Sequence, residues 1–475
     1  MNNAVTEELW RLDACAMAAG IRDRKFSSKE VIGSCLQRLD TVNPAINAMT
    51  EVRAEAALAA AENADKAIAA GKVPGLLHGV PVTIKSNVDV QGWATVNGCA
   101  ALKDNIATAN SACVQNWIDA GAIIIGRTNT PEFCCRWETS NEIFGVSHNP
   151  WDLSRTPGGS SGGAAASLAV GISPLAQGTD LGGSLRHPAQ NCGIASIKPG
   201  LGRVADWNPS DPENLGIGIQ LMNTDGPMAR RVGDVRLGLQ AMSARNYHDP
   251  WWVSAPLELS DDKHTIALVL DPAQQGINPQ VAQGVELAGR LLAEAGYEVE
   301  IIEPPGIEEA ADIWRIICLG ELLSHLVPAV KDICGQRLST TFEHYQALLP
   351  DFSTQMYMDA FARRRKVLRQ WLAFFQRYSL VVAPVCTEPP LKTDTDLESV
   401  ERLRQIIHSQ RMTVAISALS LPAAVVPVGV SAGLPQVVQI IGAPFKEMDC
   451  LAAAEAIEER AGFLTPIEPA ENATA

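Results

Sequence analysis

The sequence lacks the marks of membrane, secreted and nucleic-acid-binding proteins. It has no run of 18 apolar residues, which a membrane-spanning helix would need. Its first residues, MNNAVTEELWRL, lack the basic start and apolar core of a secretory signal. Only 38 Lys and Arg stand against 53 Asp and Glu, a formal net charge of −15. We therefore expect a cytoplasmic protein whose partner is neither a membrane nor a nucleic acid.

Metal-binding and redox motifs are also missing. The 11 cysteines contain no C-x-x-C pair, and no two of the eight histidines lie four residues apart. Zinc sites, redox-active disulfides and helical metal sites usually need such spacings. We therefore expect no metal, no cofactor and reduced thiols, as is usual in a cytoplasm.

The chain does contain an alternation of predicted helices and strands. Residues 1–70 are predicted to be helical, with a capping box from Ser27 to Glu30, and to pack on a core domain. Strands are predicted at 78–90, 121–131, 264–270, 297–303, 379–385 and 422–430, and further helices at 279–296 and 450–462. Such an alternation indicates an α/β fold with a largely buried sheet. Because no linker or repeat divides the chain, we expect one domain over 71–466 and a loose tail over 467–475.

Two glycine-rich clusters, TPGGSSGG (156–163) and TDLGGSLR (179–186), are the most distinctive local feature. Apolar segments flank both clusters, which argues against a flexible linker. A phosphate-binding P-loop is excluded because no lysine lies between Lys103 and Lys198. The dinucleotide pattern fails at Ser160, where it needs a glycine. The clusters are therefore candidates for catalysis.

The first cluster also matches the nucleophile elbow G-x-S-x-G around Ser160. That motif needs a strand directly before the serine, and NPWDLSRTP (149–157) contains two prolines and is a poor strand. A serine still needs a nearby base, and a buried lysine with a lowered pKa can serve. Lys85, at the end of a predicted apolar strand, is a candidate, although lysines are more often exposed.

At this point the residues resemble the amidase signature family. The resemblance rests on HGVPVTIKSN (78–87), TPGGSSGG and QGTDLGGSLRHPAQNCGIASIKP (177–199), and on the spacings of 75 residues from Lys85 to Ser160 and 24 from Ser160 to Ser184. It extends to GRTNTPEF (126–133), NPWD (149–152), GPMAR (226–230) and 421–442. It implies a single large α/β domain with a central mixed sheet flanked by helices.

The resemblance also implies a role for each residue of these motifs that can carry chemistry. Ser184 would be the nucleophile that forms an acyl-enzyme, Ser160 the bridging serine after a cis peptide bond, and Lys85 the base. The backbone N–H groups of Leu181, Gly182, Gly183 and Ser184 would form the oxyanion hole. Asp180 and Arg186 would be a structural pair that braces the loop.

Four further residues are candidates for the substrate pocket: Cys134, Trp137, His187 and Cys318. Core packing is the safer interpretation of Cys134, and a polar loop residue is an equally good interpretation of His187. The expected reaction is hydrolysis of a small-molecule carboxamide. A carbamate or ester hydrolase with the same groups, and an A-type subunit of a glutamine-dependent amidotransferase, stay open, as does a homo-oligomer. The segment 203–227 departs from the pattern of the amidotransferase subunits.

Overall fold

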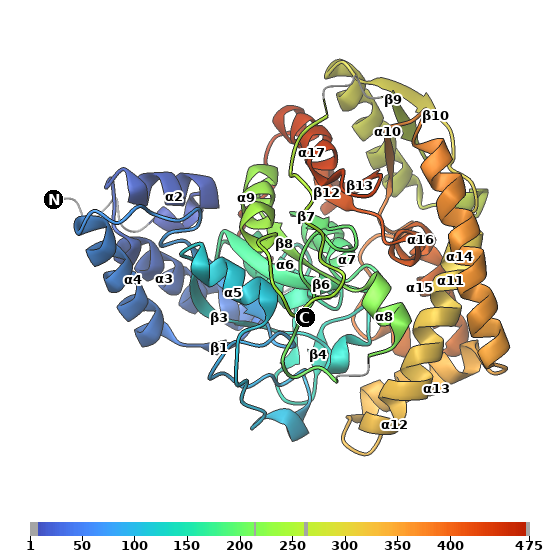
Figure 1. Cartoon of the computed structure of the whole chain (residues 1–475), viewed down its shortest axis with the longest axis horizontal. Coiled ribbons are helices and arrows are strands. Elements are labelled where there is room, and N and C mark those ends of the chain that lie inside the picture. The colour runs from blue at the N-terminus through green and yellow to red at the C-terminus, as the bar shows by residue number, and fades with distance from the viewer. Residues whose placement is uncertain (1–7, 213–214, 261–264, 472–475) are drawn as a thin grey trace.

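An 11-stranded mixed sheet organises the computed structural model, which describes residues 8–212, 215–260 and 265–471 (Figure 1). Its strand order is β1-β3-β2-β6-β8-β7-β12-β13-β11-β9-β10. The strands are β1 (Met49–Val52), β2 (Pro81–Lys85), β3 (Ile123–Thr128), β6 (Leu175–Asp180), β7 (Ala195–Lys198), β8 (Thr224–Ala229), β9 (Thr265–Leu268), β10 (Glu298–Ile301), β11 (Leu380–Pro384), β12 (Ala423–Ser431) and β13 (Leu434–Gly442). A separate small ribbon pairs β4 (Ser140–Asn141) with β5 (Gly145–Val146).

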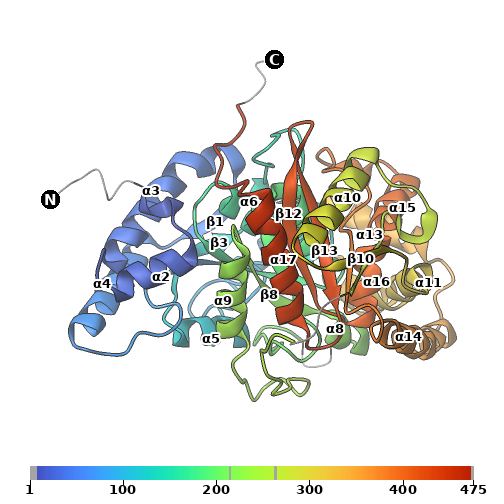
Figure 2. The same cartoon turned by 90° about the horizontal axis from the view of Figure 1, so that it is seen from above.

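Helices cover both faces of this sheet (Figure 2). Those of the first half are α2 (Ala14–Arg22), α3 (Ser28–Ile46), α4 (Ala54–Ala69), α5 (Ala112–Asp119), α6 (Gly162–Ala169), α7 (Arg186–Cys192), α8 (Ile217–Met222) and α9 (Val232–Met242). Those of the second half are α10 (Pro279–Glu294), α11 (Ile307–Trp314), α12 (Val327–Val330), α13 (Gln336–Leu348), α14 (Thr354–Phe374), α15 (Val400–Ser409), α16 (Arg411–Leu419) and α17 (Glu447–Ala461). The expected single α/β domain with a mixed sheet is confirmed.

Alternation along the strands explains the two-sided burial. On β6, Leu175 belongs to the core shared with α9, α10 and α17, whereas its neighbour Ala176 belongs to the core shared with α6 and α7. Successive side chains of a strand point to opposite faces, so a sheet covered on both sides needs apolar residues at both. The polar ends of β2 and β6 are the exceptions, and they build the site described below.

Most predicted elements are confirmed, including the strand ending at Lys85 and the capping box of α3. The prediction of an all-helical start was wrong, because β1 lies between α3 and α4 and pairs antiparallel with β3. His264, in the predicted strand 264–270, lies outside the described residues.

The last described residues are tied to the domain. Ile467 N–H donates to Ala169 O, Arg38 forms an ion pair with Glu468 at 2.9 Å, and Ala470 N–H donates to Pro150 O. The structure thus gives residues 467–470 fixed partners, although the sequence predicts a loose tail there. Residues 472–475 of the predicted tail lie outside the described part of the chain.

In the described part of the chain, one helical stretch, Ile307–Val330, is long and apolar enough to cross a membrane by length and composition. It runs from α11 through π-helical turns at Arg315–Leu319 and Leu322–Leu326 to α12. α11 packs on α14 and α16, and Ile313, Trp314 and Ile317 are buried in a hydrophobic core. Packing inside the domain therefore accounts for its apolar composition.

Candidate active site

Lys85 is held at the buried end of β2, where parallel β6 runs beside it. Its side chain is fully buried, with Nζ 2.6 Å from Ser160 Oγ and 2.8 Å from Thr179 Oγ1. Burial lowers the pKa of Lys85, although the Cys134 thiol and the carboxylates of Asp180 and Asp225 oppose the shift. A lysine with a lowered pKa next to a serine hydroxyl can act as a general base.

The first glycine cluster carries Ser160 on a tightly packed turn. The Gly159–Ser160 peptide bond is cis, and Gly158 has a φ of +85°, a region that favours glycine. A side chain at Gly159 would come within 2.5 Å of Arg136 O. Ser160 O accepts from Thr130 Oγ1 at 2.9 Å, which fixes the turn against the end of β3. The predicted turn and its serine are thus present.

The second cluster lies directly beside the first. Ser161 N–H donates to Ser184 O at 3.2 Å. Ser184 is half-buried, whereas Lys85 and Ser160 are fully buried. The two clusters therefore form one site, in which Ser184 is the serine that an incoming molecule can reach.

Asp180 and Arg186, the pair that the resemblance implies for bracing the loop around Ser184, form a buried ion pair. The two side chains are fully buried and 3.0 Å apart, and Arg186 also donates to Ser417 Oγ and Gln439 Oε1. Burial alone would raise the pKa of Asp180, but the guanidinium of Arg186 holds it below its usual value. The carboxylate stays ionised and accepts from Gly183 N–H at 2.8 Å.

This contact bears on the expected oxyanion hole. The Gly183 N–H is engaged by Asp180, whereas the N–H groups of Leu181, Gly182 and Ser184 make no hydrogen bond within the described residues. The carbonyl of Leu181 accepts a hydrogen bond from Trp314 Nε1 at 2.9 Å, which leaves its N–H free. Leu181, Gly182 and Ser184 therefore offer the free donors in this loop.

The predicted pocket residues Trp137 and Cys318 share a buried aromatic cluster with Trp314 and Tyr345. The ring centroids of Trp137 and Trp314 are 6.1 Å apart, and those of Trp137 and Tyr345 are 6.5 Å apart with perpendicular planes. Such separations are typical of favourable aromatic pairs. Because Leu181 packs against this cluster, the aromatic wall adjoins the loop of Ser184.

Cys134 and His187 lie closer to the catalytic groups. Cys134 is partly exposed, with φ of +60°, and its thiol interacts with Lys85. His187 is 2% exposed in the first turn of α7, and burial lowers its pKa to about 4. Its Nδ1 has no hydrogen-bond partner within the described structure. A neutral imidazole with one unpaired ring nitrogen therefore lies next to the site.

Three residues that the sequence does not single out also belong to the site: Thr179, Trp314 and Gln410. A side chain at Gly183 would lie 3.3 Å from Gln410 Oε1. Gln410 is fully buried, and both amide atoms lack a partner in the described structure. Thr179 lies inside a quoted motif and could have been noticed. The other two come from distant segments without a local signal.

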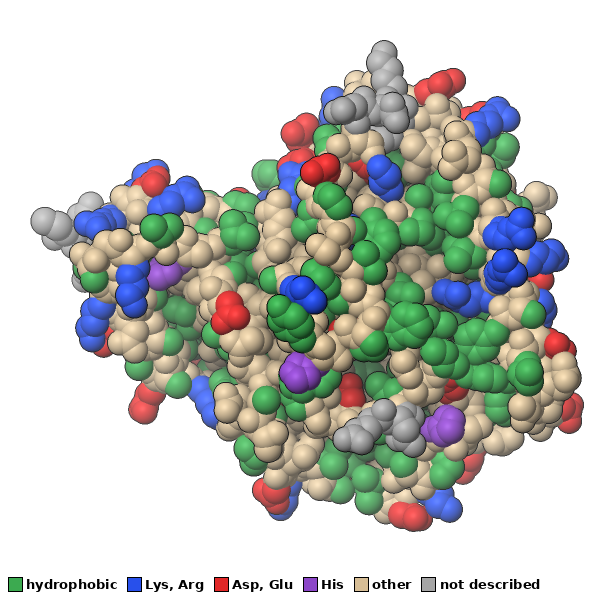
Figure 3. Space-filling view, in the orientation of Figure 1, with side chains coloured by type: hydrophobic (Ala, Val, Ile, Leu, Met, Phe, Trp, Pro, Cys, Tyr) green, Lys and Arg blue, Asp and Glu red, His purple; other side chains and the backbone are tan. Residues whose placement is uncertain are grey.

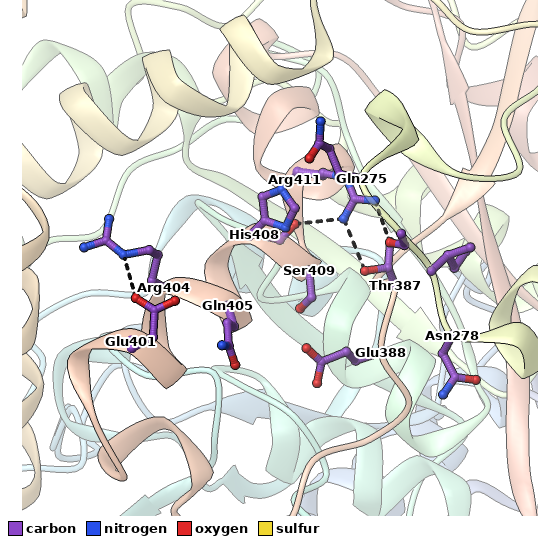
Figure 4. A pocket seen from close by; sticks show the side chains of 12 residues that line it. Gln275, Asn278, Thr387, Glu388, Glu401, Arg404, Gln405, His408, Ser409 and Arg411 are labelled. Atoms are coloured by element: carbon purple, nitrogen blue, oxygen red, sulfur yellow. Dashed lines mark hydrogen bonds and ion pairs between the residues drawn. The ribbon is translucent and has the colours of Figure 1, made fainter.

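Two other polar regions contain none of the predicted site residues. A groove of about 470 Å³ is lined by residues of 275–278, 387–388 and α15 with Arg411, and it includes none of the predicted site residues (Figure 4). Arg411 there donates to Thr387 and to His408 O. Elsewhere, Asp394 and Asp396 form ion pairs with Arg136, at 3.0 Å and 2.6 Å. Arg136 thus offsets part of the negative charge of the cluster of Glu138, Asp394 and Asp396.

Comparisons with known proteins agree with this geometry. A family model described as Amidase matches residues 30–451. The chain is 40% identical to an indoleacetamide hydrolase of Bradyrhizobium diazoefficiens over 96% of its length and 88% of the relative's. It is 30% identical to the A-type subunit of the glutamyl-tRNA(Gln) amidotransferase of Picosynechococcus, covering 92% and 95% of the two chains. A solved bacterial aryl acylamidase of the amidase signature enzymes is 26% identical, with a TM-score of 0.84 over 95% of this chain and 96% of that one.

Proposed function

Because the chain belongs to the amidase family, and so is a hydrolase of carbon–nitrogen bonds other than peptide bonds, we propose that it cleaves a neutral arylacetamide through an acyl-enzyme on Ser184. The observation that carries the proposal is the contact of the buried Lys85 with Ser160, in a turn bonded to the backbone of Ser184. Indoleacetamide is the first candidate substrate, since two relatives are indoleacetamide hydrolases.

The proposed reaction begins with a neutral Lys85. It takes the proton of Ser160 as Ser160 takes that of Ser184, whose Oγ attacks the amide carbon. The N–H groups of Leu181, Gly182 and Ser184 stabilise the negative charge that develops on the amide oxygen. The proton then returns by the same path to the leaving nitrogen, so that ammonia departs and the acyl group stays on Ser184. Water, activated by the same groups, releases the carboxylic acid.

The aromatic cluster supports an aryl group on the acyl side of the substrate. Trp137 and Trp314 lie next to the loop of Ser184 and offer flat apolar surfaces. The face shown in Figure 3 gathers hydrophobic side chains over the region of α8 and α11, beside a hollow in the surface. Both helices border the end of β6, since α8 leads into β8 and α11 ends at Trp314. Substrate would enter from this side.

Gln410 is the proposed polar contact of that substrate. A buried amide with neither donor nor acceptor satisfied is costly, and a ligand can supply the missing partner. Its Oε1 is suited to accept from a neutral N–H such as that of an indole ring. A glutamine side chain carries no charge, so a neutral acyl group suits it better than a charged one.

The second candidate function is glutamine hydrolysis within an amidotransferase, which the similarity to the A-type subunits of such enzymes favours. A carbamate or ester could also use the same groups. A panel of indoleacetamide, phenylacetamide, acetamide, glutamine and a matched aryl ester separates these functions. We expect turnover of the two arylacetamides by the isolated chain. Turnover of glutamine alone, or of esters alone, would contradict the proposal.

The nucleophile is tested with a serine-directed sulfonyl fluoride and mass spectrometry of the labelled peptides. We expect one adduct, on Ser184, and at least a ~1000-fold loss of kcat in Ser184→Ala, a loss typical of removing a nucleophile. Ser173→Ala is the matched control, because that buried hydroxyl bonds only Leu175 O. An adduct on Ser160, or unchanged turnover in Ser184→Ala, would exclude the proposed roles.

A further inference from the structure

A buried carboxylate lies next to the groups that contact Lys85. In the antiparallel pair of β6 and β8, Asp225 is directly opposite Thr179. Side chains of directly opposite residues lie on the same face with Cβ atoms about 5 Å apart. The hydroxyl of Thr179 is the one that lies 2.8 Å from Lys85 Nζ. Asp225 therefore lies one side chain away from the ammonium group.

A second connection links Asp225 to the backbone of Lys85. Gln177, two residues before Thr179 on β6, accepts from Lys85 N–H at 3.2 Å. Its other end donates to Asp225 Oδ1 at 2.6 Å. Residues two apart on a strand share a face, so Gln177, Thr179 and Asp225 line the same side of the sheet. The carboxylate thus has a fixed place relative to the lysine.

No arginine or lysine forms an ion pair with Asp225 within the described residues, although Asp225 is only 5% exposed. The groups that face it are Lys85 from β2, Gln177 and Thr179 from β6, Cys113 from α5, and Asp206 and Asp211 from the segment after β7. Lys85 is the only cation among them. Besides Asp225, the ionisable groups that act on Lys85 are Cys134 and Asp180, and Asp180 is already paired with Arg186.

We propose that Asp225 is a positioning residue for amide hydrolysis, whose carboxylate compensates the charge of the Lys85 ammonium and thereby sets how readily the lysine takes up and returns the proton. The proposal rests on the role of Lys85 in the proposed function. Lys85 gains one proton from Ser184 through Ser160, and Asp225 neither gains nor loses one. The ammonium then gives the same proton to the leaving nitrogen.

The sign of the effect follows from the charges. An ionised Asp225 favours the ammonium form of Lys85. The neutral, active form of Lys85 is therefore populated only at higher pH. Burial raises the pKa of Asp225 to about 6, so the carboxylate is ionised above that pH. In Asp225→Asn we expect the acidic limb of kcat/KM to move down by about one pH unit, the order that one charge at this range gives.

The test follows two readouts of the full chain against pH: kcat/KM for an arylacetamide, and the rate at which a sulfonyl fluoride labels Ser184. Both acidic limbs should move together in Asp225→Asn, and Asp225→Glu should restore them. Asp234→Asn is the matched control, because burial also raises the pKa of that aspartate to about 6, it accepts from Cys15 N–H of α2, and it is not among the main groups that act on Lys85. In Asp234→Asn the acidic limbs of both pH profiles should lie at the same pH as in the wild type.

The proposal would be overturned if a folded Asp225→Asn variant showed no shift of the acidic limbs. An equal shift in Asp234→Asn would also overturn it. If Asp225→Asn does not fold, Asp225→Ser carries the same expectation. The labelling rate separates this inference from the proposed function, because it needs no amide turnover. A wild-type chain that is labelled at Ser184 but cleaves no amide would end the proposed function, and the labelling limb would still test Asp225.

Discussion

At the scale of single residues, Gln410 shows how a group can be arranged for a ligand rather than for stability. Leaving a buried donor or acceptor unsatisfied costs about 1–3 kcal/mol per group. Gln190, also buried, has both ends paired, since its Nε2 donates to Glu388 O and its Oε1 accepts from Cys386 N–H. The two glutamines therefore form a natural comparison.

We expect Gln410→Met to raise the free energy of unfolding by about 1 kcal/mol, because methionine fills a similar space without unpaired polar atoms. The KM for indoleacetamide should rise about tenfold, the effect of one lost hydrogen bond. The KM for phenylacetamide, which has no ring N–H, should hardly change. Chemical denaturation and steady-state kinetics measure these effects.

Gln190→Met serves as the control and should lower the free energy of unfolding by about 1 kcal/mol, because it leaves Cys386 N–H and Glu388 O without their partners. Destabilisation in both variants would argue against an unsatisfied amide at Gln410. Equal changes of KM for the two substrates would argue against its contact with the indole N–H.

Lys85, Ser160 and Ser184 could be proposed from the sequence because long local motifs surround each of them. Within those motifs the structure brings Lys85 beside Ser160, and the backbone of Ser184 beside Ser161. Gln410 could not be proposed in this way. It lies 226 residues after Ser184, and no spacing in the sequence encodes the contact of its side chain with Gly183.

At the scale of elements, the end of α11, where the helix passes into a π-helical turn, connects the aromatic cluster to the loop of Ser184. Trp314, the last residue of α11, donates to Leu181 O, and a side chain at Gly182 would meet its ring at 2.5 Å. π-helical turns are often found at functional sites. The indole therefore both supports the loop and limits the space around it.

We expect Trp314→Phe to lower kcat about tenfold, because the loop that offers the Gly182 and Ser184 N–H groups loses the hydrogen bond that supports it. A donor that is misplaced by a fraction of an ångström stabilises the oxyanion less. The cost in stability should be about 1 kcal/mol for one hydrogen bond, plus the lost ring contacts. Trp371→Phe is the matched control, since this fully buried indole of α14 donates to Pro305 O. An equal fall of kcat in both variants would contradict the specific role of Trp314.

The elements that the sequence predicted well are those with a strong local pattern. The amphipathic α10 and the apolar β11 and β12 are confirmed close to their predicted bounds. β1 was missed because its four residues, MTEV, have only two apolar members and are followed at once by an alanine-rich helix. Its pairing with β3 is a tertiary contact, which overrides weak local preference.

At the scale of the whole molecule, all eleven cysteines are free, and eight of them are buried. The chain also buries many charged groups in its large core, and these decide how its stability responds to pH. Burial raises the pKa of several carboxyl groups, to about 7 for Glu138 and Glu458 and to about 6 for Asp211, Asp225 and Asp234.

The raised pKa values of these carboxyl groups should make the protein less stable as the pH rises from about 4.5 to about 7. In that range the folded state keeps protons that an unfolded carboxyl, with a pKa of about 4, has already lost, and the free energy of unfolding falls with pH wherever the folded state holds more protons. His187 and His408 act in the opposite direction, since burial lowers the pKa of both, that of His187 to about 4, but they are two groups against a larger number of carboxyl groups.

Above neutral pH the slope should reverse, because burial lowers the pKa of Lys198 to about 7 and an unfolded lysine still holds its proton there. We therefore expect the midpoint of thermal unfolding to be higher at pH 5 than at pH 7, with a minimum near neutrality. Calorimetry across this range measures the curve, and Glu458→Gln should flatten its acidic side, because the amide cannot titrate while the residue keeps an oxygen for Val232 N–H. A midpoint that rises steadily from pH 5 to pH 7 would show that the folded protein does not hold these protons.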